Sequence, residues 1–124
     1  MENFDLILAL GHIIFGGFFF LMGLSHFTKN ESLSAYAASK KVWQPKIAVY
    51  VSGSLILVGG LGIIAGRFVT LSSLLILAFL VPITFSMHAF WKEKDVQVKM
   101  LDQVQFLKNT ALIGAALILL AHSL

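Results

Sequence analysis

The sequence predicts an all-α integral membrane protein, a four-helix bundle of antiparallel up-and-down topology whose first two helices are rich in glycine. Hydrophobic residues make up 58% of the 124 residues and charged residues only 12%, against about 25% charged residues in water-soluble domains. The charge-free blocks are residues 6–28, 47–66, 68–91 and 109–124. A bilayer-spanning helix needs about 20 apolar residues, so three blocks qualify directly and Gln103–Leu107 extends the fourth. We expect one domain, 1–124, with helices at about 6–27, 46–66, 68–91 and 103–123.

The first predicted helix, 6–27, begins after an acidic start and is longer than the apolar core of a signal peptide, so we expect it to be retained. Helical spacing places His12, Gly16, Gly23 and His26 on one face. Glycine at such positions allows close approach of a neighbouring helix. Each histidine then either hydrogen-bonds a neighbour or contributes to a ligand or proton site.

The 28–46 connection has Leu33, Tyr36 and Ala37 at helical spacing, which favours a short amphipathic helix in the membrane interface. Pro45 suits the first turn of the second helix. Within that helix, Gly62 and Gly66 form a G-x-x-x-G pattern that indicates close packing. We expect this packing inside the bundle, with a homo-oligomer as the alternative.

The third predicted helix, 68–91, contains Pro82, which frees the carbonyl of Ala78 and predicts a kink. Such a break in the backbone commonly borders a cavity. Beyond it, Thr84, His88 and Trp91 share one face. In the fourth helix the shared face carries Gln105, Asn109, Leu112 and Ala116, with Lys108 beside it.

The net charge of +3 is unevenly distributed. Lysines of the connections 28–46 and 92–108 lie on one side of the predicted bundle, namely Lys29, Lys40, Lys41, Lys46, Lys92, Lys94, Lys99 and Lys108. The other side has Arg67 alone. This asymmetry predicts a multi-pass protein of the cell membrane with both connections cytoplasmic, both termini outside and lipid as its first partner. No basic stripe is interleaved with exposed aromatic residues, so nucleic acid is excluded as a partner.

Up-and-down threading brings a set of polar and aromatic side chains to one membrane depth, and we take this set as the candidate ligand site. Its members are His26, Tyr50, His88, Phe90, Trp91, Gln105, Lys108 and Asn109. Lys108 is the costliest member, because a cation near the start of a membrane helix is disfavoured. The free-energy cost of this cation would be reduced by an acidic partner (Glu93, Asp95 or Asp102) or by an anionic or carbonyl-bearing ligand. It would also be reduced if the side chain reached the lipid headgroups.

The chemistry of this set favours binding over catalysis. Haem and metal ligation are disfavoured, since no H-x-x-x-H or E-x-x-H pair occurs, and we assign no metal site. No carboxylate at membrane depth completes a Ser–His–Asp triad, and the chain has no cysteine. A quinone-like ligand suits the set better, because the site offers an apolar slot, aromatic rings and donors for carbonyl oxygens. The sequence does not identify a catalytic residue.

Four segments carry a resemblance to a known family. They are G-L-S-H-F at Gly23–Phe27, S-G-S-L-I-L-V-G-G-L-G in the second helix, H-A-F-W at His88–Trp91 and F-L-K-N at Phe106–Asn109. With these the chain resembles the DoxX family of small four-helix membrane proteins, although His26 stands where many relatives have lysine. The resemblance implies a four-helix bundle and, for some members, a role beside quinone-linked or thiol-handling oxidoreductases.

Two functions follow as hypotheses. The first is a quinone- or lipid-binding accessory subunit of a membrane redox system, with a redox enzyme as partner. The second is a non-catalytic membrane scaffold or assembly factor, in which the polar set only holds the bundle together. Transport is less favoured, because Pro82 is the one broken-helix feature at mid-depth.

Overall fold

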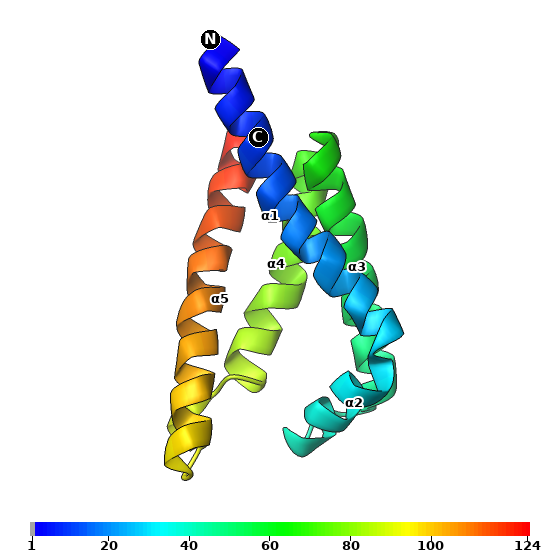
Figure 1. The fold of residues 1–124 in the computed structure, drawn as a ribbon, viewed down its shortest axis with the longest axis vertical. Coiled ribbons are helices and arrows are strands. Elements are labelled where there is room, and N and C mark those ends of the chain that lie inside the picture. Colours follow the sequence, from blue (N-terminus) through cyan, green and yellow to red (C-terminus); the bar gives the residue numbers. More distant parts are fainter. Residues whose placement is uncertain (1) are drawn as a thin grey trace.

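The computed structural model describes residues 2–124, and side chains from Asp5 onward. Over this range the chain forms five α-helices and one short 3₁₀ helix (Figure 1): α1 (Glu2–Thr28), α2 (Asn30–Ser39), α3 (Pro45–Ala65), α4 (Val69–Ser86), η1 (Phe90–Lys92) and α5 (Val96–Ser123). Helices α1, α3, α4 and α5 fall in four segments long and apolar enough to cross a membrane. The predicted all-α membrane bundle is confirmed.

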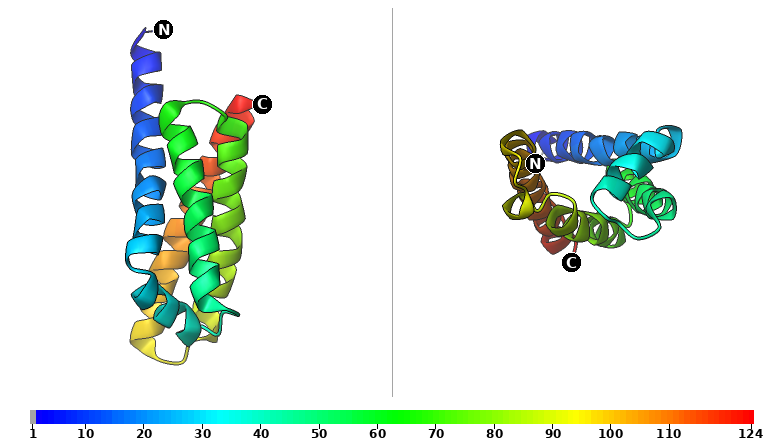
Figure 2. Two further views of the ribbon diagram at one scale, coloured as in Figure 1. Left: turned by 90° about the vertical axis from the view of Figure 1, so that its right-hand side faces the viewer. Right: turned by 90° about the horizontal axis from the view of Figure 1, so that it is seen from below.

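The four long helices alternate in direction, so that both termini lie at one end and α2 and η1 lie at the other (Figures 1 and 2). Helix α1 packs along α3, α3 along α4, and α4 along α5. Helices α1 and α5 diverge toward the end that carries α2 and η1 (Figure 1). The bundle is therefore tightly packed on one side and spread apart on the other.

The bounds of the second helix agree closely with the predicted 46–66. Pro45 occupies the first turn of α3, where its missing N–H costs nothing. Gly66 follows the last turn with φ +66°, and its N–H bonds to Ile63 O. A residue without a side chain ends the helix there because this backbone conformation is unfavourable for other residues.

Helices α4 and α5 differ from the predicted ranges 68–91 and 103–123. Helix α4 ends at Ser86 instead of 91, and the buried residues Met87, His88 and Ala89 turn back under the bundle. Helix α5 begins at Val96 instead of 103, because the Asp95 side chain accepts bonds from Gln97 N and Val98 N and caps it. Like the helix before it, the turn has no charged residue as far as Trp91, which is why the charge-free block 68–91 did not mark the break.

Glycines bring α1 and α3 together, as the sequence predicted. A Cβ at Gly16 would lie 2.7 Å from Gly60 O, and a Cβ at Gly60 would lie 2.6 Å from Gly16 O. Further along, a Cβ at Gly23 would lie 2.8 Å from Leu57 Cα. We call this contact the glycine seam: Gly16 and Gly23 of α1 against Leu57 and Gly60 of α3. Its backbones lie too close for any side chain between them.

The opposite face of α3 packs against α4 by the same means. A Cβ at Gly59 would lie 2.9 Å from Ile76 Cγ1. Gly62 faces the side chain of Ser72 so closely that a Cβ there would overlap its hydroxyl. The first glycine of the G-x-x-x-G pattern thus packs within the bundle, as expected, whereas the second, Gly66, ends the helix.

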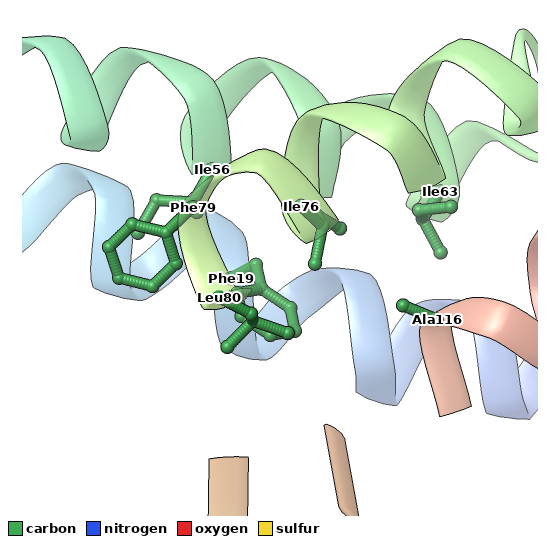
Figure 3. Close-up of a cluster of buried hydrophobic side chains, with 7 residues drawn as sticks. All are labelled: Phe19, Ile56, Ile63, Ile76, Phe79, Leu80 and Ala116. Carbon is green, nitrogen blue, oxygen red and sulfur yellow. The ribbon is translucent and has the colours of Figure 1, made fainter. Parts of the chain in front are cut away.

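The buried apolar cluster is built from side chains of α1, α3, α4 and α5 (Figure 3). It contains Phe19, Ile56, Ile63, Ile76, Phe79, Leu80 and Ala116. Ala116 is the member from α5, and its small side chain lets that helix approach the cluster. This packing fixes the upper half of the bundle and leaves the lower half to be held by other contacts.

Helix α2 lies beneath the spread end of the bundle (Figure 2). Ala37, with Leu33 beside it, packs against Val49 of α3 and Met87. Its opposite face is exposed, which agrees with the amphipathic interfacial helix expected from the sequence. Lys46 O also accepts a bond from Asn30 Nδ2 at 3.3 Å, so both ends of the 28–46 connection are joined.

Candidate functional site

A cavity of about 740 Å³ occupies the spread end of the bundle, between the lower halves of α1, α3, α4 and α5, with α2 below it. Most of its wall is apolar, including Phe19, Met22, Leu55, Ile83 and Leu112. Pro82 and Ala78 also border it, so the proline lies beside a cavity, as the sequence suggested. Ligand pockets typically measure about 300–1,000 Å³. The cavity is therefore large enough for the headgroup of a lipid-soluble molecule.

Five of the eight predicted site residues line this cavity, and they come from two helices and one turn. They are His26 of α1, His88 of the turn after α4, and Gln105, Lys108 and Asn109 of α5. The structure thus brings these five side chains to one cavity. That they bind a ligand stays a prediction.

Asn109 is the most unusual of the five. The residue is only 6% exposed, and its carboxamide has no hydrogen-bond partner among residues 5–124. Because the residue lines the cavity, its carboxamide opens into that space, and an amide that meets only apolar groups there loses about 1–3 kcal/mol of hydrogen bonding. Its neighbours Gln105 and Leu112 line the same wall, one turn to each side. The position therefore presents a donor and an acceptor to the cavity that the protein leaves unused.

His26 lies on the opposite wall, in α1. Its Nδ1 is 2.7 Å from Met22 O, one turn back along the helix. A Cβ at Gly53 would lie 2.5 Å from the Cβ of His26, so α3 touches the base of this side chain. The ring meets Phe79 edge-on, with centroids 5.8 Å apart. These contacts hold the imidazole in one position at the cavity wall.

His88 is held by a buried carboxylate. Its Nδ1 lies 3.4 Å from Asp102 Oδ1, and Asp102 is only 2% exposed. A charge buried so deeply requires a partner of opposite sign. Lys40 of α2 supplies it, with Nζ 2.5 Å from Asp102 Oδ2 and 2.9 Å from Glu93 Oε1. We call Lys40, Glu93, Asp102 and His88 the polar clasp, because it joins α2, the η1 turn and α5.

Charges in the clasp alter the acid–base behaviour of α2. Burial lowers the pKa of Lys40, but hydrogen bonds to Asp102 and Glu93 raise it by more, so the net pKa lies above its ordinary value of 10.5. Burial, followed by the charge of Asp102, raises the pKa of Tyr36 above 10.0. Lys40 is thus charged and Tyr36 neutral at physiological pH, which favours a closed clasp.

Lys108 has none of the acidic partners expected for it. Glu93 and Asp102 bind Lys40, and Asp95 caps α5. Within the described part of the chain, Lys108 has no ion pair; its Nζ lies 5.8 Å from the centroid of the Phe18 ring of α1. The side chain borders the cavity on the side where α1 and α5 diverge, and it is exposed there. It stands as a free cation at the cavity edge.

The three remaining predicted residues lie outside the cavity wall. Tyr50 is exposed and packs on Phe27, with ring centroids 5.6 Å apart. Phe90, Trp91 and Phe106 form an aromatic group, and Trp91 is half exposed. The predicted depth of these residues does not bring them to the cavity, because their side chains point to other sides of the bundle.

Reasoning from sequence missed Lys40 and Tyr36 of α2. Both had been assigned to the membrane surface, since lysine and tyrosine are common there. The feature that could have revealed their role is the carboxylate of Asp102, which lies shortly before the apolar part of the last helix. A carboxylate there needs a cation, and Lys40 is the one that reaches it across 62 residues of sequence.

Comparison with known proteins gives one match. The model of a protein family described as DoxX matches residues 7–89, which include most of α1, all of α2, α3 and α4, and His88. Neither the search of curated proteins nor the search of solved structures found a match to the chain. The matched range ends before α5, so it does not include Asp102, Lys108 or Asn109.

Proposed function

The chain belongs to the DoxX family of multi-pass membrane proteins, and from that premise we propose that it is a quinone-binding accessory subunit of a membrane redox system. The ligand headgroup would occupy the cavity between α1, α4 and α5. The isoprenoid or alkyl tail would leave between α1 and α5, where the helices diverge (Figure 1). No catalytic residue is assigned, and electron transfer would belong to a partner enzyme.

The observation that carries this proposal is the unpaired carboxamide of Asn109 in a cavity whose wall is mostly apolar. Ordinary lipid tails cannot hydrogen-bond it, so a cavity filled by tails alone would leave the amide unsatisfied. A headgroup with polar atoms on a flat ring satisfies the amide and fills the apolar space. Lys108 at the edge supports the same assignment, because an ammonium donates to carbonyl oxygens.

We further propose that the end of the bundle carrying the cavity faces the cytoplasm. The two connections that carry the lysines lie at this end, and the turn between α3 and α4, which contains Arg67, lies at the other (Figure 1). Positively charged connections are retained on the cytoplasmic side. Cysteine labelling of single-cysteine variants at Trp43 and Ser123 tests it: a membrane-impermeant reagent applied to intact cells should modify position 123 and spare position 43.

A binding titration tests the function. Protein in lipid nanodiscs is titrated with a short-chain quinone, and Asn109→Leu is compared with Thr110→Val. Thr110 is the neighbouring exposed residue, and its hydroxyl bonds only to Phe106 O in the described chain. We expect saturable binding in the wild type and Thr110→Val, and about tenfold weaker binding in Asn109→Leu. Absence of saturable binding to the wild type would refute the proposal.

A second candidate is a scaffold or assembly factor, which the clasp favours. The ion pairs of Lys40 with Glu93 and Asp102 join segments that are distant in sequence. This structural role is enough to account for the presence of these charged residues. On this view His88→Ala lowers the thermal midpoint, partner proteins co-purify, and no extractable quinone is enriched. Mass spectrometry of lipid extracts from the purified protein separates the two candidates. Quinone enrichment that Asn109→Leu removes without loss of stability excludes the pure scaffold.

A further inference from the structure

The two histidines of the cavity each have one ring nitrogen whose role is fixed by the protein. Nδ1 of His26 lies 2.7 Å from Met22 O, and a carbonyl oxygen can only accept. Nδ1 therefore carries the proton. In the neutral imidazole the other nitrogen, Nε2, is then an acceptor with its lone pair free.

His88 has the same tautomer for a different reason. Its Nδ1 faces Asp102 Oδ1 at 3.4 Å, and the other oxygen of that carboxylate is held by Lys40. A carboxylate bound to an ammonium is ionised and accepts only, so Nδ1 of His88 carries the proton. Its Nε2 is again an acceptor when the ring is neutral. Asp102 is thus a positioning residue that sets the direction in which His88 can hydrogen-bond.

Neither Nε2 atom has a hydrogen-bond partner among the described side chains, and both residues line the cavity. Both residues are more than nine-tenths buried. Their Nε2 atoms open into the cavity, whose wall is mostly apolar, and an acceptor in such a space is stabilised by a donor from a bound molecule. A quinone has two carbonyl oxygens, which also accept, so it leaves both imidazoles unsatisfied. Its reduced form has two hydroxyl groups, which donate.

We infer that the cavity selects the hydroquinone form over the quinone, through donation from its hydroxyl groups to Nε2 of His26 and of His88. This inference rests on the proposed function and specifies the redox state of its ligand. Asn109 can donate or accept, and Lys108 can donate to a carbonyl oxygen or to a hydroxyl oxygen, so neither residue discriminates between the two forms. The groups facing His88 are Asp102 and Lys108 of α5, Lys40 of α2 and His26 of α1 across the cavity.

The test compares three short-chain ligands under anaerobic conditions in nanodiscs: the hydroquinone, the quinone and the hydroquinone dimethyl ether. The ether keeps the shape of the ring but has no donor. We expect the wild type to bind the hydroquinone about tenfold more tightly than either of the other two. Diacylglycerol is a fourth arm, because a neutral lipid hydroxyl offers the same donor chemistry without the ring.

The variants separate the two histidines from the fold. His26→Phe and His88→Phe should each reduce the preference for the hydroquinone by at least about threefold. His12→Phe is the matched control: His12 is also in α1 and also contacts the carbonyl four residues back, Leu8 O, at 2.8 Å, but it lies outside this cavity. It should keep the wild-type preference. His26→Gln is the second variant if phenylalanine prevents folding, since its amide also donates and therefore weakens the preference.

The outcomes distinguish this inference from the function on which it rests. Equal binding of hydroquinone and quinone, or tighter binding of the quinone, overturns the inference and leaves the function standing. Failure of every ring ligand to bind overturns both. Diacylglycerol binding as tightly as the hydroquinone, with the same loss in His26→Phe, overturns the assignment of a quinol.

Discussion

The glycine seam and the polar clasp hold the two ends of one bundle by opposite means. At the seam, Gly16 and Gly60 let two backbones meet with no side chain between them. At the clasp, Lys40 and Asp102 join α2 to α5 through charged side chains. The seam leaves no space, whereas the clasp spans a distance and leaves the cavity beside it. Close contact between backbones thus leaves no space between α1 and α3, whereas contact through long polar side chains lets a cavity remain between the helices.

The first and largest expected effect comes from removing the cation of the clasp. Lys40→Met leaves the carboxylate of Asp102, which is almost fully buried, without its ammonium partner. Breaking a buried ion pair costs about 3–5 kcal/mol. The thermal midpoint of the detergent-purified protein should therefore fall sharply.

Lys41→Met is the matched control, because Lys41 is the next residue in the same connection but is exposed. It should leave the midpoint unchanged. If both variants behave alike, the clasp does not hold this end of the bundle, and the contrast between the two regions fails.

The second effect tests the seam. Gly16→Ala places a methyl group 2.7 Å from Gly60 O, so the helices must separate. Overpacking of this kind costs about 1–3 kcal/mol. Gly17→Ala is the control, since a Cβ there has nothing within 4 Å; it should be neutral or slightly stabilising, because alanine favours helix. Unfolding in a denaturing detergent measures both, and equal losses would contradict the assigned seam.

The third effect concerns the cavity wall itself. Asn109→Leu replaces an unpaired buried amide by an apolar side chain of similar size, so the free energy of unfolding should change by less than about 1 kcal/mol or rise. Ligand binding should nevertheless weaken about tenfold. The same denaturation series as for the seam measures it. A large destabilisation would mean that Asn109 supports the fold and has a structural role.

The smallest effect under ordinary conditions is that of pH on the clasp. The folded-state pKa of Lys40 lies above 10.5 and that of Tyr36 above 10.0. Both groups therefore contribute stability that is fully present below these values and is lost as pH rises through the folded-state pKa. The midpoint should stay level from neutral pH to about 10 and then fall. The fall should be smaller in Lys40→Met, and a decline that begins near pH 8 would contradict the assignment.

Much of the fold was predictable because the bilayer determines helix length. Long charge-free blocks gave the spans, and glycines at helical spacing gave the seam. Depth was also predictable, which is how His26, His88, Lys108 and Asn109 were placed together. The rotation of each helix about its own axis was not predictable, because a helix in lipid is apolar on every side and its sequence does not mark the buried face. Tyr50 points away from the cavity, and Trp91 lies in η1 beyond the end of α4, so neither lines it.

The clasp was beyond prediction for a different reason. Lys40 and Asp102 are 62 residues apart, and each resembles an ordinary interfacial charge in sequence. Their pairing depends on where α2 lies beneath the bundle, and on α5 beginning at Val96, seven residues before the predicted start. Asp95 was a readable signal for that start, since aspartate is a preferred N-cap residue. It had been considered as a partner for Lys108 instead.

The divergence of α1 and α5 also determines how occupancy should be measured. A guest entering sideways comes from the surrounding hydrocarbon, where an oily molecule is already concentrated by partitioning. The occupancy of the cavity then depends on the mole fraction of this molecule among the lipids, and its aqueous concentration matters little. Detergent alkyl chains would enter by the same route, so a preparation in micelles contains a competitor for the cavity. In the native membrane, even a site of modest intrinsic affinity can be filled.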